Sequence, residues 1–350
     1  MVENVVIIPS RNEADSIGEV ARRIDAGLTA LGLTGNSLII NTDNSLDGET
    51  SAAFLDATTN TPKISVRTGG EGKGDNILHG LRLALGERAS AICMFDGDLE
   101  SFDPSWLGEY LAALEAGKDF VAPRYARYWI EGGTTNHLSM PTVHALAPAA
   151  VMQPIAGDFG LSARLARRLL SEPATQEQRE YGIDFMISGT AIFEAMAIAE
   201  VALGQKIHKP SFDKTEATFL GAASSMFDLI ARYQPKLPTG SHSTIETQPL
   251  LDAAPISKEK LAARAESARQ LLRDCGIRSD EGPIDAEHWI EIVRDHIARA
   301  YNDEPGSDVA RSIWPYFLLR TVEFLSEARS GAAAAEIVAD QARRLQRSLS

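Results

Sequence analysis

Short apolar runs alternate with amphipathic segments over the first 220 residues of the chain. The apolar runs indicate buried strands at Val5–Ile8, Leu38–Asn41, Ile64–Arg67, Ala91–Phe95 and Phe120–Ala122. Between them, Ser16–Leu31 and Asn76–Leu85 repeat apolar residues with the period of a helix that buries one face. The alternation predicts an α/β fold with a mainly parallel sheet flanked by helices, in which ligands bind outside the carboxyl ends of the strands.

The last part of the chain has a different pattern. Residues 233–256 are polar, carry Pro, Gly, Ser and Thr, and show no regular period, which is typical of a linker or an ordered loop. Beyond them the pattern is helical throughout, and the expected helices are Lys258–Asp274, Asp285–Ala300, Val309–Ala328 and Ala332–Leu349. We therefore expect an α/β domain over residues 1–232, a connecting segment over 233–256 and a helical C-terminal region over 257–350.

Composition narrows the choice of partners. The chain has 350 residues and a formal net charge of −14, so its surface repels phosphate backbones and nucleic acid is not an expected partner. Neither Cys93 nor Cys275 belongs to a CxxC pair that would indicate a zinc or redox site. The acidic N-terminus lacks the pattern of a signal peptide, and no apolar stretch is long enough to span a membrane. We therefore expect a cytoplasmic protein.

Two carboxylates follow the strand that ends at Phe95. Asp96 and Asp98 are separated by one glycine, so both side chains can turn toward one hard cation. Mg²⁺ and Mn²⁺ accept such oxygen ligands and keep sites open for a diphosphate. Two solvated aspartates on an ordinary loop would give the same short pattern. The pair therefore indicates a metal site only together with the motifs that follow the other strands.

Polar residues follow two other strands of the expected sheet. They form the segments Pro9-Ser10-Arg11-Asn12-Glu13 and Asn41-Thr42-Asp43-Asn44-Ser45-Leu46-Asp47-Gly48. Asp43 is suited to accept hydrogen bonds from a base or ribose, and Arg11 to approach a phosphate. Helix capping is the alternative for such residues, and we prefer it for Asp47, whereas we expect Asp43 and Glu13 to contact a ligand.

A glycine-rich segment, Gly69-Gly70-Glu71-Gly72-Lys73-Gly74-Asp75-Asn76, directly precedes a predicted helix. Its glycines would let the backbone approach a ligand closely, and a lysine at a helix start can meet a phosphate or sugar oxygen. It is not a P-loop, because Gly74 and Asp75 stand where Ser or Thr would follow the lysine.

The order of these motifs resembles that of retaining GT-A glycosyltransferases, in particular the group that contains glucosyl-3-phosphoglycerate synthase and mannosylglycerate synthase. Three later segments are similar to motifs of the same group: Gln153–Asp158, Tyr181–Asp184 and Ile198–Lys209. The resemblance covers residues 4–215 in seven ordered motifs, while the C-terminal third is similar only in its helical character.

The resemblance implies a GT-A fold and a divalent metal, Mn²⁺ or Mg²⁺, held by Asp98 and His208, with Asp96 at the ribose or at a metal-bound water. It implies that Lys73 and Asp184 act at the reacting centre. The residues that it places around nucleotide and sugar are Pro9, Arg11, Glu13, Asp43, Lys73, Asp75, Asp96 and Asp158. From the residues alone, His208 is more typical of a surface position, and Asp184 of the first turn of a helix over Phe185–Val201.

The implied reaction moves a hexose from a UDP- or GDP-sugar to a small hydroxy acid. The metal and Lys73 stabilise the departing diphosphate, and the acceptor hydroxyl attacks the face that the leaving group vacates, without a protein nucleophile. The family alone suggests a homodimer.

The expected acceptor segment departs from the family pattern. Glu131–Leu138 resembles the segment that holds phosphoglycerate in the family, which implies Gly133 and Thr134 at the acceptor, but Thr134 stands where the family has an arginine. Asn136 and His137 are the candidate partners for an acceptor hydroxyl. A neutral hydroxyl cannot make the bidentate charged contact that a phosphate favours, so glycerate becomes an alternative to 3-phosphoglycerate. Arg124 and Arg127 either serve an acidic acceptor or are surface charges.

Other functions fit the sequence less well. A transferase that acts on a sugar, lipid or polysaccharide shares the early motifs, but such enzymes usually carry a later catalytic aspartate motif that is absent here. A pyrophosphorylase needs a Gly- and Arg-rich loop after the first strand, and an NAD-dependent dehydrogenase needs GxGxxG there. A non-catalytic sugar-nucleotide-binding module need not keep Asp96, Asp98, Asp184 and His208 together.

Overall fold

The computed structural model describes residues 2–70, 72–148, 150–207, 215–235, 245–253, 256–276 and 283–349. Within these ranges eight strands form the sheet, in the order β3-β2-β1-β4-β6-β5-β7, with β8 paired to β5. Their bounds are β1 Asn4–Ser10, β2 Ser37–Asp43, β3 Lys63–Arg67, β4 Ala91–Met94, β5 Phe120–Tyr128, β6 Phe159–Ser162, β7 Ile198–Gln205 and β8 Leu250–Leu251. All five strands expected from the sequence are present, four of them within two residues at each end, whereas β5 continues six residues beyond the expected Ala122.

The first four strands run parallel to one another. β1 pairs with β2 and with β4, and β2 pairs with β3, all in parallel. In this register Ser10 lies beside Asp43, so the polar segments that follow the strands leave the sheet at one edge. β6 is antiparallel to β4 and to β5, which makes the sheet mixed rather than purely parallel.

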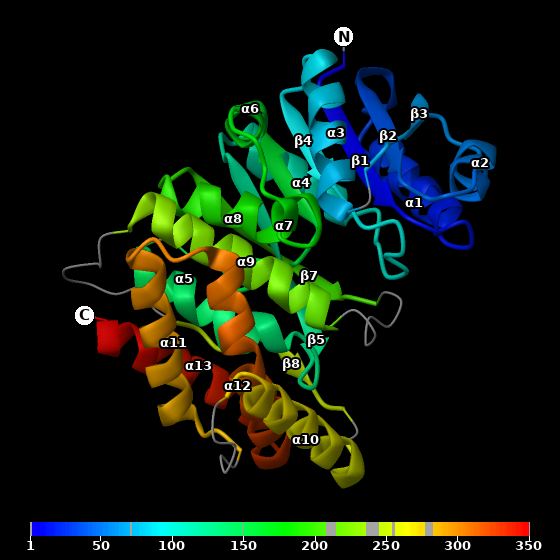
Figure 1. Cartoon of the computed structure of the whole chain (residues 1–350). Coiled ribbons are helices and arrows are strands. Elements are labelled where there is room, and N and C mark those ends of the chain that lie inside the picture. The colour runs from blue at the N-terminus through cyan, green and yellow to red at the C-terminus, as the bar shows by residue number, and fades with distance from the viewer. Residues whose placement is uncertain are drawn as a thin grey trace. The chain divides into compact units, whose positions relative to one another are not determined.

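Two groups of helices flank this sheet (Figure 1). Their bounds are α1 Ile17–Ala30, α2 Glu49–Asp56, α3 Lys73–Gly86, α4 Trp106–Glu115, α6 Ala163–Leu170, α7 Gln176–Arg179 and α8 Ile183–Phe193. α1 contacts α2 and α4, whereas α3 contacts α6, α7 and α8. The helices bury their apolar faces, with Ile17, Ile24 and Leu28 of α1 fully buried.

The chain divides into two compact units, residues 1–125 with 155–218, and residues 126–154 with 219–350. This division differs from the expected boundaries, because residues 126–154 belong with the C-terminal helices and not with the α/β part. The physical reason is packing inside the second unit. There α5 contacts α13, and Phe219 at the start of α9 packs against Trp314 and Phe317.

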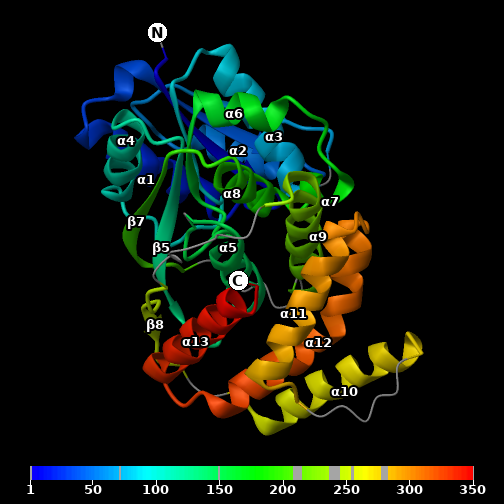
Figure 2. The same ribbon diagram turned by 90° about the vertical axis from the view of Figure 1, so that its left-hand side faces the viewer.

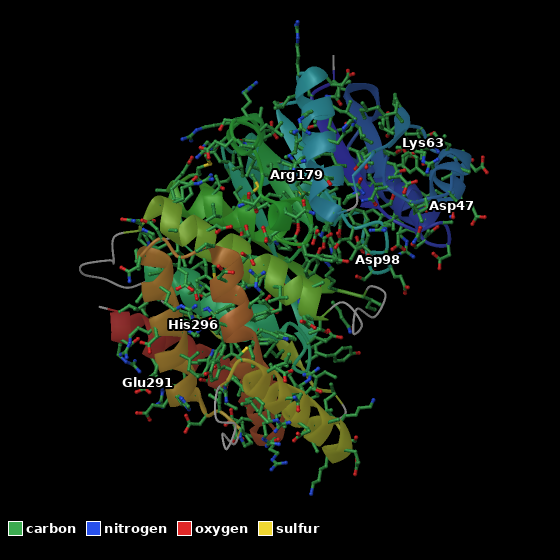
Figure 3. All side chains as sticks on the ribbon, viewed as in Figure 1. Asp47, Lys63, Asp98, Arg179, Glu291 and His296 are labelled. Atoms are coloured by element: carbon green, nitrogen blue, oxygen red, sulfur yellow. The ribbon has the colours of Figure 1, made fainter. Side chains whose placement is uncertain are left out.

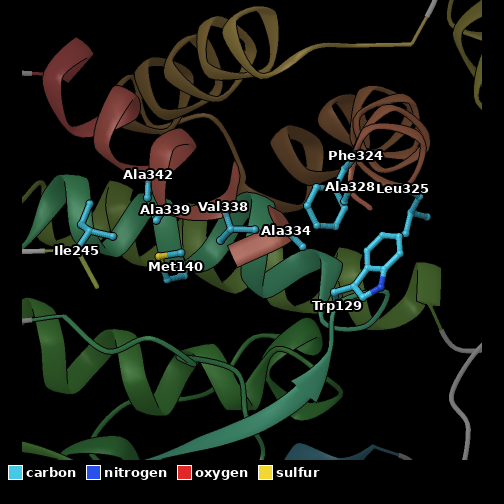
Figure 4. Packing of buried hydrophobic residues seen from close by; sticks show 10 residues of the cluster. All are labelled: Trp129, Met140, Ile245, Phe324, Leu325, Ala328, Ala334, Val338, Ala339 and Ala342. Atoms are coloured by element: carbon cyan, nitrogen blue, oxygen red, sulfur yellow. The ribbon is translucent and has the colours of Figure 1, made fainter. Parts of the chain in front are cut away.

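The second unit is helical. It contains a π-helical turn, Thr135–Ser139, and the helices α5 Met140–Leu146, α9 Thr215–Tyr233, α10 Lys258–Asp274, α11 Ala286–Tyr301, α12 Gly306–Glu327 and α13 Gly331–Leu349 (Figure 2). One apolar cluster joins Trp129, Met140 and Ile245 to Phe324 of α12 and Val338 of α13 (Figure 4). Within the expected connecting segment, Leu250 and Leu251 form β8 in parallel with the end of β5.

One predicted element is wrong. The helix expected over Phe185–Val201 ends at Phe193, and Ile198–Gln205 is the strand β7. Ala195 adopts a positive φ of 50°, which ends the helical path without a glycine to signal it. Within the described residues, no helix combines the length and the apolar character that a membrane span requires.

Candidate active site

Five charged side chains of the first unit meet at the ends of five separate elements. Lys73 is the first residue of α3, Asp96 follows β4, Asp158 precedes β6, Asp184 lies in the first turn of α8, and Lys206 follows β7. We call these five residues the charged cluster. Because helix starts and strand ends converge on it, residues far apart in the sequence share one small volume.

Lys73 bridges two carboxylates in this cluster. Its Nζ lies 2.8 Å from Oδ1 of Asp96 and 3.3 Å from Oδ1 of Asp184. Burial acts to lower the pKa of Lys73, but the carboxylates of Asp184 and Asp96 outweigh it and raise the pKa well above its usual value. Lys73 is therefore held as an ammonium. Burial raises the pKa of Asp184, which Lys73 opposes.

Lys206 holds the other side of Asp96. Its Nζ donates to Oδ2 of Asp158 at 2.6 Å, to the carbonyl of Ala156 at 2.8 Å and to Oδ2 of Asp96 at 3.3 Å. Asp158 is fully buried, accepts a hydrogen bond from the Asp96 backbone N–H at 2.9 Å, and accepts another from the Tyr125 hydroxyl at 3.0 Å. The Asp158 carboxylate is therefore occupied by protein groups, not exposed to sugar hydroxyls as the resemblance implied.

Gly157 lets the backbone approach the charged pair. It has a φ of +91°, and a Cβ at this position would lie 2.9 Å from both Asp96 Oδ2 and Lys73 Nζ. Both observations disfavour a side chain here, because a non-glycine residue is strained at this φ and its Cβ would force the ends of the Asp96 and Lys73 side chains to shift. The glycine is thus part of the wall of the cluster.

Two glycines join the start of α3 to the segment before α8. A Cβ on Gly72 would lie 2.3 Å from the carbonyl oxygen of Arg179, and one on Gly74 2.1 Å from that of Gln178. The Gly74 N–H also donates to the Glu180 carbonyl at 3.0 Å. These glycines serve protein packing, whereas we expected them to approach a ligand.

Asp75 takes part in the same junction. Its Oδ1 lies 3.1 Å from Nη1 of Arg179, which is labelled in Figure 3. The ion pair links the first turn of α3 to the end of α7, so the carboxylate that was expected at the sugar has a protein partner here.

The carboxylate of Asp43 is fully buried and holds the loop after β2. It accepts hydrogen bonds from Ser45 N–H at 3.0 Å, Ser45 Oγ at 2.5 Å and Ser51 Oγ at 2.9 Å. The hydroxyl of Ser10 donates to it at 3.4 Å. This arrangement differs from the expected contact with a base or ribose, because serine donors occupy both carboxylate oxygens.

The residues after β1 have mixed surroundings. Pro9 is buried and Arg11 is exposed. Glu13 accepts a hydrogen bond from Ser16 Oγ at 3.2 Å, and the same hydroxyl lies 3.0 Å from the Gly97 carbonyl between the two aspartates. Asp47, labelled in Figure 3, accepts the Glu49 N–H on its Oδ1 at 3.1 Å, as expected of a residue at the start of α2, although the N-cap position itself is Gly48.

The predicted metal ligands are described only in part. Asp98, labelled in Figure 3, lies with Asp96 on the loop after β4, and His208 lies outside the described residues. Over the described ranges, no three His, Cys, Asp or Glu side chains are grouped as a metal site. Ile207, the last described residue before His208, donates its N–H to Ser101 Oγ at 2.8 Å and accepts the Ser101 N–H at 3.3 Å.

The predicted acceptor residues belong to the second unit, where Gly133 and Thr134 are half-buried. His137 is buried, its Nδ1 lies 3.3 Å from Oε1 of Gln341, and its ring packs edge-on to Phe324. Burial lowers the pKa of His137 to about 3, so its imidazole is neutral. Asn136 is also buried and donates to the Glu131 carbonyl at 3.2 Å. In this structure His137 and Asn136 are packed inside the unit and present no group to a solvent-borne acceptor.

Sequence reasoning missed Lys206, Gly157 and Ser101. The sequence offered one signal for two of them, since Gly157 lies inside the Gln153–Asp158 motif and Lys206 inside the Ile198–Lys209 motif. Neither motif indicates that its residue would contact Asp96, because those contacts form only once β4, β6 and β7 belong to one sheet.

A comparison with known protein families identifies a family that matches this chain. The model of the family described as glycosyl transferase family 2 matches residues 5–201, more than half of the chain. A search of curated proteins gave no match.

Solved structures give the fold. A crystal structure of glucosyl-3-phosphoglycerate synthase from Mycobacterium tuberculosis, in complex with Mg²⁺ and uridine diphosphate, is 22% identical with a TM-score of 0.50, and the match covers 68% of this chain and 81% of that chain. Another, in complex with Mn²⁺, UDP-glucose and phosphoglyceric acid, is 23% identical with a TM-score of 0.51, covering 71% and 84%. A mycobacterial protein is 21% identical with a TM-score of 0.52, covering 73% and 81%. The α/β sheet with its flanking helices is therefore the GT-A fold.

Proposed function

Because the chain belongs to glycosyl transferase family 2, we propose that it transfers a hexose, glucose or mannose, from a UDP- or GDP-sugar to a small hydroxy acid, with retention and with a divalent metal. The observation that carries the proposal is the bridge from Lys73 to Asp96 and Asp184 beside the backbone of Gly157. It provides a fixed ammonium between two half-buried carboxylates at the edge of the sheet where nucleotides bind.

In this proposal Lys73 meets the departing diphosphate. Its pKa is raised by Asp184 and Asp96 against the effect of burial, so the positive charge is present when the sugar–phosphate bond breaks. The acceptor hydroxyl forms the new bond at the anomeric carbon, and its proton passes to the departing diphosphate oxygen. Asp184 orients donor and acceptor at the reacting face, and no protein nucleophile is needed.

The charged cluster suits a cation. Three carboxylates, of Asp96, Asp158 and Asp184, face two ammonium groups, so the cluster has one carboxylate more than it has ammonium groups. We propose that Asp96, Asp98 and His208 hold Mn²⁺ or Mg²⁺, which supplies Lewis-acid stabilisation of the diphosphate. The reciprocal hydrogen bonds between Ile207 and Ser101 support this set, because they tie the residue before His208 to the loop that carries Asp98.

The proposal for the acceptor depends on the residue at position 134, which is a threonine. It replaces the arginine that the family resemblance implies for phosphate, so we propose glycerate ahead of 3-phosphoglycerate. The M. tuberculosis enzyme was crystallised with phosphoglyceric acid, which makes the comparison of the two acceptors direct. Gly133 and Thr134 are the acceptor candidates that keep exposed surface.

Thermal unfolding with UDP-glucose, GDP-glucose and GDP-mannose, each with and without Mn²⁺, tests the donor. A ligand at a hundred times its Kd adds about 2.7 kcal/mol of stability, so we expect a metal-dependent rise in Tm with one donor. The rise should disappear in His208→Ala and persist in Lys63→Met, a lysine that caps α2 away from the cluster. If no donor shifts Tm, the proposal fails. Transfer to glycerate and to 3-phosphoglycerate is then measured with the donor identified.

A further inference from the structure

Lys206 differs from Lys73 in what its ammonium can reach. Its side chain is 6% exposed, against 18% for Lys73. All three N–H groups have acceptors, on Asp158, Ala156 and Asp96, and the ammonium lies 5.5 Å from the centre of the Tyr125 ring. An ammonium has three donors and no more, so Lys206 has none left for a substrate.

Asp96 is held at two points by this arrangement. Its backbone N–H donates to Asp158 Oδ1 at 2.9 Å, and its Oδ2 accepts from Lys206 at 3.3 Å. With Oδ2 fixed in this way, Oδ1 faces Lys73 at 2.8 Å. Lys206 and Asp158 thus determine both the place and the rotation of the Asp96 carboxylate.

The end of β7 that carries Lys206 is itself anchored. Ile207 exchanges two hydrogen bonds with Ser101, although its side chain is 47% exposed and gains little from packing. The loop that contains Ser101 is fixed in turn, because Leu99 and Phe102 are buried and Arg23 donates to the Glu100 carbonyl at 2.6 Å.

We propose that Lys206 is a positioning residue that acts through Asp96: with Asp158 it sets the Asp96 carboxylate so that Lys73 and the donor meet in one geometry. The inference rests on the proposed function, since it assigns a role within the same site. A purely structural role, as a buried ion pair that stabilises the fold, makes different predictions for paired substitutions.

Removing Lys206 alone leaves Asp158 buried without its cation, so Lys206→Met is expected to lower Tm steeply. The paired variant Lys206→Met with Asp158→Asn removes both charges and is expected to regain most of the wild-type Tm. Lys63→Met is the matched control, because this lysine donates to carbonyls of the same unit far from Asp96 in the fold.

Measurements of donor binding then distinguish a positioning role of Lys206 from a purely structural one. The probes are UDP-glucose and GDP-mannose with Mn²⁺, measured by calorimetry, and we expect the paired variant to bind about tenfold more weakly than the wild type. In an Asp96→Asn background the same pair of substitutions should change Kd by less than about twofold, because the residue through which Lys206 acts is already altered. Wild-type affinity in the paired variant, or an undiminished loss in the Asp96→Asn background, would overturn the inference.

A crystal structure of the paired variant gives a readout that needs no donor. We expect Asp96 Oδ1 to move out of hydrogen-bond distance of Lys73, while Lys63→Met leaves the 2.8 Å contact in place. An unchanged contact in the paired variant would refute the positioning role. If the wild type binds none of UDP-glucose, GDP-glucose and GDP-mannose, the proposed function fails, and the crystal structure still decides the role of Lys206.

Discussion

Lys73 Nζ lies 3.3 Å from Asp184 Oδ1, although 111 residues separate the two positions. The contact depends on main-chain packing, because Gly74 donates its N–H to Glu180 and leaves no space for a side chain beside Gln178. The geometry of the proposed reacting centre is therefore determined by a glycine next to the charged residue as much as by the charges.

Gly74→Ala tests this packing. The new Cβ would lie 2.1 Å from the Gln178 carbonyl oxygen, so the segment before α8 must move. We expect a loss of about 3 kcal/mol in the free energy of unfolding, measured by urea titration, together with weaker donor binding. Gly86→Ala is the control, because Gly86 ends the same helix with open space around it and should gain about 0.5 kcal/mol.

Gly157→Ala separates backbone strain from damage to the ion pair. Gly157 and Gly117 both adopt a positive φ, of 91° and 86°, but a Cβ on Gly117 would meet nothing within 4 Å. Each alanine variant should lose about 1–2 kcal/mol through strain. Only Gly157→Ala should also weaken donor binding in calorimetry, because its Cβ crowds Lys73 and Asp96. Equal donor affinity in the two variants would contradict the assigned role of Gly157.

Asp184→Asn is expected to abolish transfer and to change how the stability of the protein depends on pH. Burial raises the pKa of Asp184 above its ordinary value of 3.8, so the folded state holds this proton more tightly than the unfolded state does. The contribution of the Asp184 carboxyl to the free energy of unfolding is therefore complete below pH 3.8 and is lost as the pH rises through its pKa in the folded state. The stability of the variant relative to the wild type should therefore rise as the pH increases from 4 to 7.5. Thermal unfolding across this range checks the sign.

Because His137 is buried as a neutral imidazole, the stability of the folded chain should fall at acidic pH. Burial lowers its folded pKa from 6.5 to about 3, so the contribution to stability is complete above pH 6.5 and is lost as the pH falls toward 3. Near pH 5 this effect should lower the free energy of unfolding by about 2 kcal/mol. The stability gap between wild type and His137→Asn should narrow by this amount between pH 7.5 and pH 5, followed by tryptophan fluorescence in urea.

Thr134→Arg tests the proposed acceptor. An arginine here would supply the charged contact to a phosphate that the threonine lacks, so the ratio of transfer to 3-phosphoglycerate over glycerate should rise about tenfold or more. Thr134→Met adds bulk without charge and should lower both rates without changing their ratio. A preference for 3-phosphoglycerate in the wild type would show that another residue binds its phosphate.

The sequence by itself determined the fold class and the family. Apolar runs at the first strands and helical spacing in α1 and α3 are local properties, and the structure confirms those elements. The family resemblance drawn from ordered motifs is confirmed as well. Lys73, Asp96 and Asp184 were also recognisable in the chain, because motif residues keep their order along it; their roles stay proposals.

Only the tertiary structure decided what those residues touch. The sequence cannot indicate that Lys206 is buried against Asp158, because that burial exists only once β7 lies at the end of the sheet and β6 inserts antiparallel beside β4. The same holds for His137. The sequence motif predicted that it contacts an acceptor, whereas in the structure its ring packs against Phe324. Burial and hydrogen-bond partners are set by elements distant in sequence, and a local pattern carries no information about them.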